Sequence, residues 1–134
     1  MSEKKYRITV SESQLHMIAN CVEDCSRFMA GQTEMYNTTS MLENMHEVHE
    51  VLNGTYPYVV PDLCFKYGRG ASYPWNGGEC PNEHQRKFIA ASYYLYREIR
   101  HFDAVRRNVD NVYRSWTLCC KDSGMPIVIE EVKD

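Results

Sequence analysis

The chain has 134 residues, of which 43% are hydrophobic and 25% are charged, a length and composition that suit one globular domain and exclude intrinsic disorder. Its net charge of −3 argues against generic nucleic-acid binding, which needs a surplus of Lys and Arg to contact phosphates. No segment reaches the ~20 apolar residues of a transmembrane helix, and the N-terminus lacks the apolar core of a signal peptide. We therefore expect a single cytoplasmic domain over residues 1–134, with its six cysteines reduced.

The first predicted elements are a strand and a helix. Residues 6–10 alternate and are rich in β-branched side chains, which predicts a short strand. Ser11 and Gln14 have the spacing of a capping box, so a helix should begin beside Ser11, and Gly31 is placed to end it. The inner face of this helix is predicted to carry Leu15, Ile18, Ala19, Val22, Cys25 and Met29.

A second helix is predicted from a capping box of Ser40 and Glu43, with Gly54 at its end. Because the connection between them is short, the first two helices should form an antiparallel pair. Residues 55–81 are rich in proline and glycine, which favours a long loop with residues 56–61 extended. The inner face of the second helix is predicted to carry Met41, Met45, Val48 and Leu52.

The longest predicted helix covers residues 82–107. Pro81 is tolerated in a first turn, and Asn82 with Gln85 has the spacing of a third capping box. One side carries an apolar stripe of Phe88, Ala91, Leu95, Ile99 and Phe102. The other side carries Arg86, Tyr93, Arg97 and Arg100, and is either a solvated face or a stripe that faces an anion.

The C-terminal segment is predicted to form a β-hairpin. Residues 111–119 and 125–132 alternate as strands, and residues 121–124 form the turn between them. Because a lone hairpin is marginally stable, we expect residues 6–10 to join it as a third strand. The predicted fold class is therefore α+β, with three helices packed on a small antiparallel β-sheet made of the N-terminal strand and the C-terminal hairpin.

The loop of residues 68–81 and the start of the longest helix form the predicted ligand site. Glycines let backbone N–H groups approach a phosphate, a helix N-terminus favours negative charge, and aromatic rings can stack on a base. The alternative is a surface loop whose Trp75 plugs the core. The predicted ligand-binding residues are Tyr73, Trp75, Asn76, Gly77, Gly78, Arg86, Tyr93 and Arg97.

Other residues that could take part in catalysis or metal binding form weaker patterns. Cys80 precedes the longest helix, where the helix dipole favours a thiolate, and His84 lies one turn later. A thiol enzyme has such a Cys/His pair, but no third, orienting group is identifiable. His46 and Glu50 lie four residues apart without the zincin spacing, and no Cys-x-x-Cys pair occurs. We predict no metal site, no cofactor and no catalytic residue.

Several motifs carry a family resemblance. Within residues 8–42, "SESQL", "ANCVEDCSRFMAGQ" and "NTTSML" resemble a family of small uncharacterised proteins encoded by phages and prophages of gut bacteria. The segments "GGECPNEHQRKFIAASYYLYREI", "NVY" and "SGMPI" fit the same family. The resemblance implies a protein of the host bacterial cytosol that inhibits or diverts a host system, and it implies no particular activity or binding residue.

The leading functional prediction is a non-enzymatic phage accessory protein that binds and sequesters a small anionic ligand, such as a nucleotide signal of host anti-phage defence. The alternative is an interaction module that binds a host or phage protein through a tyrosine-rich surface. A cysteine enzyme that uses Cys80 is the third hypothesis. We expect no membrane partner, and the ten tyrosines and seven methionines predict a homo-oligomer, most simply a twofold dimer.

Overall fold

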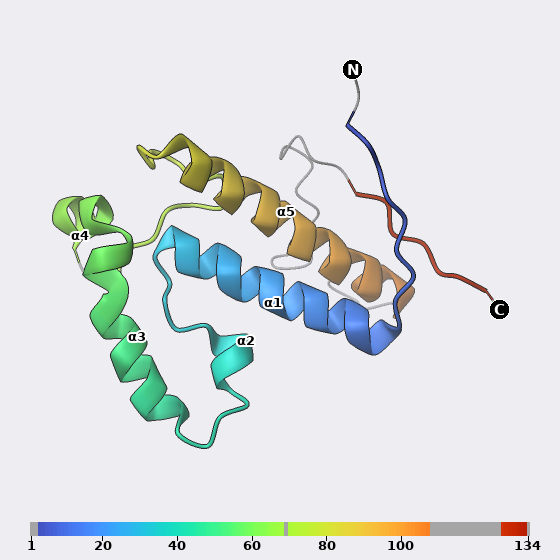
Figure 1. The fold of residues 1–134 in the computed structure, drawn as a ribbon, viewed down its shortest axis with the longest axis horizontal. Coiled ribbons are helices and arrows are strands. Elements are labelled where there is room, and N and C mark those ends of the chain that lie inside the picture. The colour runs from blue at the N-terminus through green and yellow to red at the C-terminus, as the bar shows by residue number, and fades with distance from the viewer. Residues whose placement is uncertain (1–2, 69, 108–126, 134) are drawn as a thin grey trace.

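The computed structural model of the protein describes residues 3–68, 70–107 and 127–133. Two long helices lie side by side, a short helix lies alongside one of them, and two further helices lie beyond one end of the pair (Figure 1). None of the described helices combines the length and the apolar character that crossing a bilayer would require. In chain order the helices are α1 (Glu12–Ala30), α2 (Tyr36–Thr39), α3 (Met45–Val59), α4 (Pro61–Tyr67) and α5 (Glu83–Arg106).

Helix α1 begins and ends where the sequence predicted. The hydroxyl of Ser11 accepts a hydrogen bond from the backbone N–H of Gln14 at 3.1 Å, and the Gln14 side chain accepts one from the N–H of Ser11 at 2.8 Å. Gly31 ends the helix with a φ of 112°, a left-handed conformation that glycine adopts without steric cost. Both signals are local, which is why the sequence alone located them.

The start of α5 also lies where the sequence predicted. The side chain of Asn82 accepts a hydrogen bond from the N–H of Gln85 at 3.0 Å. The Gln85 side chain does not return this bond. It donates instead to the carbonyl of Met29 on α1 at 2.8 Å, so it joins the two helices.

Helices α1 and α5 pack antiparallel through a narrow core. Ala19 of α1 and Tyr96 and Ile99 of α5 are almost fully buried, and the small Ala19 lets the two backbones approach closely. The predicted apolar stripe of α5 was right at Ile99, which is buried, and at Leu95, which packs against this core, but wrong at the start of the helix, where Phe88 is 43% exposed and Ile89 is 1% exposed. The buried positions of α5 that follow the spacing of three and four are Ile89, Ser92, Tyr96, Ile99 and Asp103.

Two polar residues in that buried row explain the error. Ser92 satisfies its hydroxyl within the helix by donating to the carbonyl of Phe88 at 2.6 Å. Asp103 is held by ion pairs with Arg106 and Arg107 at 3.2 and 3.0 Å. A hydrophobicity pattern treats both positions as solvent-facing, and therefore rotates the predicted inner face away from the real one.

A second core lies where the end of α1 meets α3, α4 and the loop before α5. Tyr56 at the end of α3 and Leu63 of α4 are buried in this core, and so are Tyr73 and Cys80 of the loop. The Tyr56 hydroxyl donates to the carbonyl of Ala71, which ties α3 to the loop. The buried members of this cluster are Ala30, Tyr56, Val60, Leu63, Tyr73, Cys80 and Ile89.

The predicted α+β fold was wrong: the part of the chain that the structure describes is helical and contains no strand or sheet. Residues 6–10 form no strand and pair with no other segment among the described residues, and Tyr6 is 85% and Ile8 79% exposed. In residues 127–133 the alternation is present, but Ile127 and Ile129 pack on the α1–α5 core, so the segment lies on helices instead of in a ladder. The predicted strand 111–119 and turn 121–124 lie outside the described residues.

The second predicted helix was also misplaced. It begins after Asn44 instead of beside Ser40, and it continues through Gly54 and Pro57 to Val59, where an end at Gly54 and an extended segment 56–61 were expected. Burial of Tyr56 in the second core outweighs the unfavourable glycine and proline. Pro61 then occupies the first turn of α4, where the N–H group that proline lacks is not needed for a hydrogen bond within the helix.

The pairing of the first two predicted helices was wrong as well. Helix α1 packs on α5 and on the short α2, whereas α3 contacts α2 and α4. Helix α2 is capped from α1: the buried carboxylate of Asp24 accepts hydrogen bonds from the N–H groups of Asn37 and Thr38 at 3.1 and 2.7 Å. Cys25, expected on the inner face of α1, is exposed.

Candidate functional site

The loop before α5 folds tightly against the helix start. The N–H of Gly77 donates to the carbonyl of Pro74 at 2.8 Å, and the N–H of Gly78 donates to the side chain of Asn76 at 2.9 Å. Gly77 has a φ of 80°, and a Cβ there would lie 2.5 Å from Cγ of Arg86. These glycines therefore make the turn and its contact with α5, and their N–H groups are already hydrogen-bonded within the loop.

Trp75 stands at the rim of a cleft between this loop, α1 and α5, which we call the Trp75 cleft. Its volume is about 260 Å³. The Trp75 ring lies 6.1 Å from the ring of Tyr93, with 37° between their planes, and Trp75 is 39% exposed. Trp75 is thus not a core plug. The cleft is lined by Ser26, Arg27, Ala30, Gln32, Ser72, Tyr73, Pro74, Trp75, Ile89, Tyr93 and Tyr96.

A chain of polar side chains accompanies these aromatic rings. Arg27 donates from Nε to Glu23 at 3.0 Å and from Nη1 to the side chain of Gln32 at 2.7 Å. Gln32 in turn donates to the hydroxyl of Ser72 at 3.3 Å. The Trp75 cleft therefore offers aromatic surface together with one oriented arginine.

The eight predicted ligand-binding residues divide into two groups. Tyr73, Trp75 and Tyr93 line the Trp75 cleft. Arg86 does not, because its guanidinium donates to the carbonyl of Cys80 at 2.7 Å and holds the loop to α5. Arg97 is 6% exposed and lies 5.5 Å from the centre of the Tyr93 ring, behind the aromatic wall. The loop residues Asn76, Gly77 and Gly78 shape the turn, as described above.

Tyr73 anchors the loop into the second core. Its hydroxyl donates to a carboxylate oxygen of Asp62 on α4. Burial and this hydrogen bond raise the pKa of Tyr73 well above its ordinary value. The Tyr73 hydroxyl therefore stays protonated at all ordinary pH values and donates this hydrogen bond. The bond holds the Tyr73 ring in place in the wall of the Trp75 cleft.

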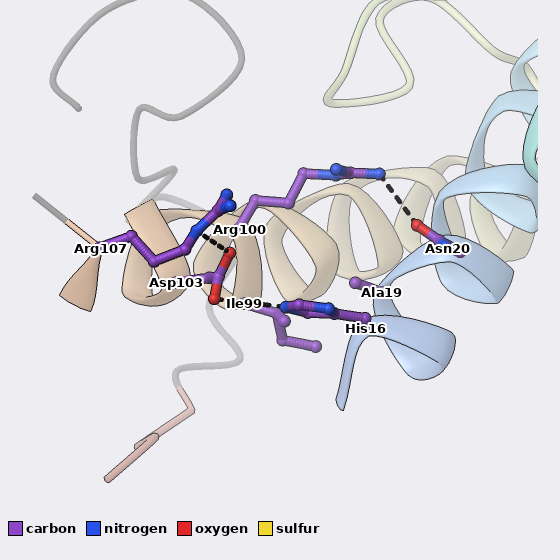
Figure 2. Close-up of a pocket in the computed structure, with 7 residues that line it drawn as sticks. All are labelled: His16, Ala19, Asn20, Ile99, Arg100, Asp103 and Arg107. Atoms are coloured by element: carbon purple, nitrogen blue, oxygen red, sulfur yellow. Dashed lines mark hydrogen bonds and ion pairs between the residues drawn. The ribbon is translucent and has the colours of Figure 1, made fainter. Parts of the chain in front are cut away.

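A second pocket, which the sequence did not indicate, lies at the other end of the α1–α5 pair (Figure 2). Its volume is about 290 Å³. Nε2 of His16 lies 3.3 Å from Oδ1 of Asp103, Nε of Arg107 lies 3.0 Å from Oδ2, and Arg100 donates to the side chain of Asn20 at 3.2 Å. Every polar group named here takes part in a contact between or within the two helices.

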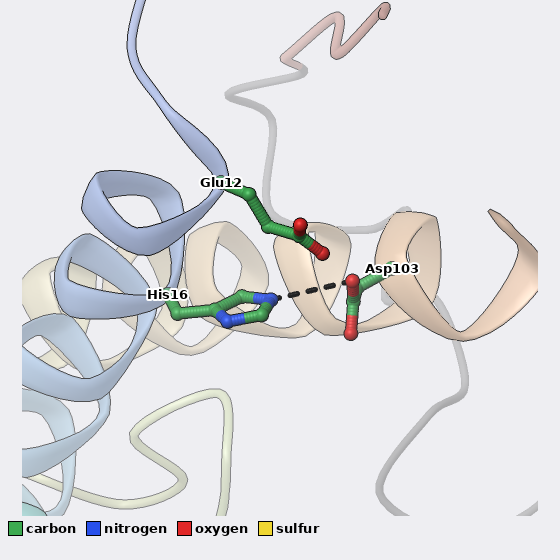
Figure 3. Close-up of side chains that lie close together, drawn as sticks. All are labelled: Glu12, His16 and Asp103. Atoms are coloured by element: carbon green, nitrogen blue, oxygen red, sulfur yellow. Dashed lines mark ion pairs between the residues drawn. The ribbon is translucent and has the colours of Figure 1, made fainter. Parts of the chain in front are cut away.

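Glu12, His16 and Asp103 converge at this end of the helix pair (Figure 3), with three possible ligand atoms within 4.8 Å of one another. Such a set of one imidazole and two carboxylates can bind a divalent cation. Here, however, Nη2 of Arg106 donates to both Glu12 and Asp103 and supplies the positive charge between them. We interpret the cluster as an ion-pair network that joins the start of α1 to the end of α5.

The sequence missed this cluster because its members are far apart in the chain. The antiparallel pairing of α1 and α5 places position 16 opposite position 103, whereas the sequence analysis had paired the first helix with the second. The signal that would have revealed it is the length of the two well-capped helices, which favours packing against each other over packing on a short second helix.

The proposed Cys/His pair is not assembled. Cys80 is 1% exposed and its thiol faces the carbonyl of Asn82 at 3.7 Å, whereas His84 is exposed. The exposed His46 and Glu50 lie 3.4 Å apart on α3 as an ordinary surface pair. Comparison of the chain with protein-family models, curated proteins and solved structures found no match.

Proposed function

We propose that the protein is a non-enzymatic binding module that holds a small, ring-bearing anion of the nucleotide class in the Trp75 cleft. The observation that carries this proposal is the pairing of Trp75 with Tyr93 in the wall of a cleft of about 260 Å³. Stacking a base on an aromatic side chain contributes about 1–3 kcal/mol and tolerates any base, because every base has a π-face.

The position of Arg27 in the cleft is the reason for expecting an anionic ligand. Its Nε and Nη1 groups are oriented by Glu23 and Gln32, and its Nη2 group makes no hydrogen bond to the described residues. A guanidinium held in place loses little entropy when it binds a phosphate or carboxylate, and charge-assisted hydrogen bonds are about twice as strong as neutral ones. Arg27 thus replaces Arg86 as the expected anion contact.

In this proposal the ligand is retained and not converted. The Cys80 thiol is 1% exposed, and the Glu23 carboxylate beside Arg27 is held by an ion pair, so we assign both to the structure and not to chemistry on the ligand. The resemblance to phage and prophage proteins favours sequestration of a nucleotide signal in the cytosol of a bacterial host.

The test is a fluorescence titration. Trp75 and Trp116 are the two tryptophans of the chain, so a Trp116→Phe background leaves Trp75 as the single reporter. Nucleoside monophosphates, cyclic mononucleotides and cyclic dinucleotides are titrated in turn, and one of them should quench Trp75 saturably. At a hundred times its dissociation constant that ligand should also stabilise the fold by about 2.7 kcal/mol. Failure of every nucleotide in both measurements would reject the proposal in favour of the interaction module.

Matched variants locate the site by calorimetry. Trp75→Ala and Arg27→Gln should each weaken binding by about 1–3 kcal/mol, through the lost stacking and the lost charge-assisted hydrogen bond. Phe88→Ala and Lys87→Gln remove an aromatic ring and a cation from exposed positions of α5 that do not line the Trp75 cleft, and should leave affinity unchanged. If the two control variants lost as much affinity as Trp75→Ala and Arg27→Gln, the ligand would bind outside the Trp75 cleft.

A further inference from the structure

The middle of the chain has an unusual distribution of charge. No Lys or Arg occurs between Arg27 and Lys66, whereas this stretch contains five carboxylates. The stretch includes α2, α3 and most of α4. A positively charged partner would therefore meet no repulsive side chain along this part of the molecule. The five carboxylates are Glu34, Glu43, Glu47, Glu50 and Asp62.

Helix α3 turns one face away from the rest of the protein. Val51 is 68% and Tyr58 is 87% exposed, and Glu47 and Glu50 are exposed as well. Val51 follows Glu47 by four residues, and Gly54 and Tyr58 follow Glu50 at successive spacings of four, so these residues share one face of the helix. At Gly54, an added Cβ would meet nothing within 4 Å. This face is open, acidic and partly apolar.

The connection from α2 to α3 and the first turn of α3 carry further exposed apolar side chains. Met41 is 78%, Leu42 is 45% and Met45 is 38% exposed. Helix α3 packs on α2 and α4 and projects away from the α1–α5 pair (Figure 1). We define the α3 surface as the exposed face of α3 together with the preceding connection: Met41, Leu42, Glu47, Glu50, Val51, Gly54 and Tyr58.

The carboxylates of the α3 surface take no part in holding the fold together. The Lys and Arg ion pairs of the described residues involve Glu12, Glu23, Glu83 and Asp103, all on α1 or α5. Glu47 pairs with no cation among the described residues, and Glu50 only meets the exposed His46 at 3.4 Å. The negative charge of α3 is therefore available to a partner.

We propose that the α3 surface is a docking site for a basic amphipathic helix of another protein. Lys and Arg at the flanks of such a helix would meet Glu47 and Glu50, and its apolar side chains would cover Met41, Leu42, Val51 and Tyr58. Acidic surfaces repel both nucleic-acid phosphates and anionic lipid headgroups, so neither is the occupant.

A second copy of the chain is a poorer occupant on the same charge argument. The arginines of α5 are used within their own chain, Arg100 by Glu23 and Arg106 by Glu12 and Asp103. They do not form a basic apolar face that could meet α3. The inference is independent of the Trp75 cleft, because none of the residues of the α3 surface lines that cleft.

The probe is a synthetic helical peptide with leucines on one face and lysines on its flanks, titrated into the isotope-labelled protein by NMR. Shifts should concentrate on residues 41–58. Val51→Ser, and Glu47→Lys with Glu50→Lys, should each lower affinity at least about tenfold, and added salt should weaken the wild-type complex. A scrambled peptide of the same composition should bind at least about tenfold more weakly.

Matched controls use exposed residues of α5. Val105→Ser and Glu83→Lys change the same residue types outside the α3 surface and should not alter affinity. Equal effects of the control variants, equal binding of the scrambled peptide, or shifts centred on another face would overturn the proposal. So would a homodimer, seen by light scattering, that the paired Glu47 and Glu50 substitutions dissociate, since the α3 surface would then belong to a second copy.

Discussion

Asp103 illustrates how one carboxylate can link the ends of two helices. Burial raises its pKa, but the contact with His16, the hydrogen bond from Arg106 and the charge of Arg107 outweigh burial, and the net pKa is lowered from its ordinary value. A carboxylate whose pKa is lower in the folded state than in the unfolded state contributes stability above its unfolded pKa. That contribution is lost as the pH falls through the folded value.

We therefore expect Asp103→Asn to destabilise the protein at neutral pH and to reduce the loss of stability below about pH 4, the ordinary range of an aspartate. Urea unfolding between pH 2 and pH 7 measures both effects. The exposed Glu43, which pairs with no cation among the described residues, supplies the control Glu43→Gln. Parallel pH profiles for wild type and Asp103→Asn would contradict the role assigned to this carboxylate.

Asp24 has a different task, since it replaces the missing N-cap of a neighbouring helix. Met35 stands at the N-cap of α2 and has no side chain that can accept a hydrogen bond, so the N–H groups of Asn37 and Thr38 bond to Asp24 instead. Asp24→Asn should cost about 1.5–3 kcal/mol, because hydrogen bonds to a buried charged acceptor are lost. Thermal unfolding measures this. Glu83→Gln, at an exposed position, should change stability by less than about 0.5 kcal/mol.

At the scale of elements, we expect substitutions of two glycines by alanine to change the stability of the protein in opposite directions. Gly54 lies inside α3 with open space around it, so Gly54→Ala should stabilise the protein by about 0.5–1 kcal/mol through a lower entropy cost of folding. Gly31 ends α1 with a φ of 112°, and a Cβ there would lie 2.9 Å from the carbonyl oxygen of Ala71. Gly31→Ala should therefore destabilise it. Melting temperatures that move in the same direction for both variants would contradict these assignments.

The sequence predicted the elements that depend on local signals and failed on those that depend on distant contacts. The caps at Ser11, Gly31 and Asn82 act within one turn, and each was located correctly. The continuation of α3 through Pro57 depends on burying Tyr56 against residues far along the chain, which no local pattern reveals. In the candidate site, the same limit explains why Trp75 and Tyr93 were named while Arg27 was missed.

At the scale of the whole molecule, the packing of residues 127–133 explains why the predicted return strand was wrong. Alternating apolar residues predict that one side of an extended segment is buried, but they do not say what buries it. Ile127 and Ile129 fulfil the alternation by packing on α1 and α5. For residues 127–133, the predicted fold assumed a strand partner, whereas the packing partners in the described part of the chain are helices. The homodimer stays a prediction, which light scattering can test against the 15.7 kDa mass of one chain.

The reactivity of the cysteine thiols can show whether the whole fold unfolds as one unit. Cys21 and Cys25 lie exposed on α1, whereas Cys80 is 1% exposed in the core that joins α1, α4 and the loop. A maleimide should modify Cys21 and Cys25 in the native protein. It should modify Cys80 at least about 10³-fold more slowly, because Cys80 requires unfolding that is populated at about 10⁻³ or less.

Peptide mass spectrometry after timed labelling reads each cysteine separately, and labelling in denaturant provides the reference in which the three thiols react alike. Cys80→Ser should also leave ligand binding intact, because the thiol does not line the Trp75 cleft. If Cys80 reacted as fast as Cys25 in the native state, its thiol would be accessible, and the cysteine-enzyme hypothesis would replace the binding module. Slow labelling of Cys80 that accelerates in step with global unfolding would instead show that this core opens only when the whole fold does.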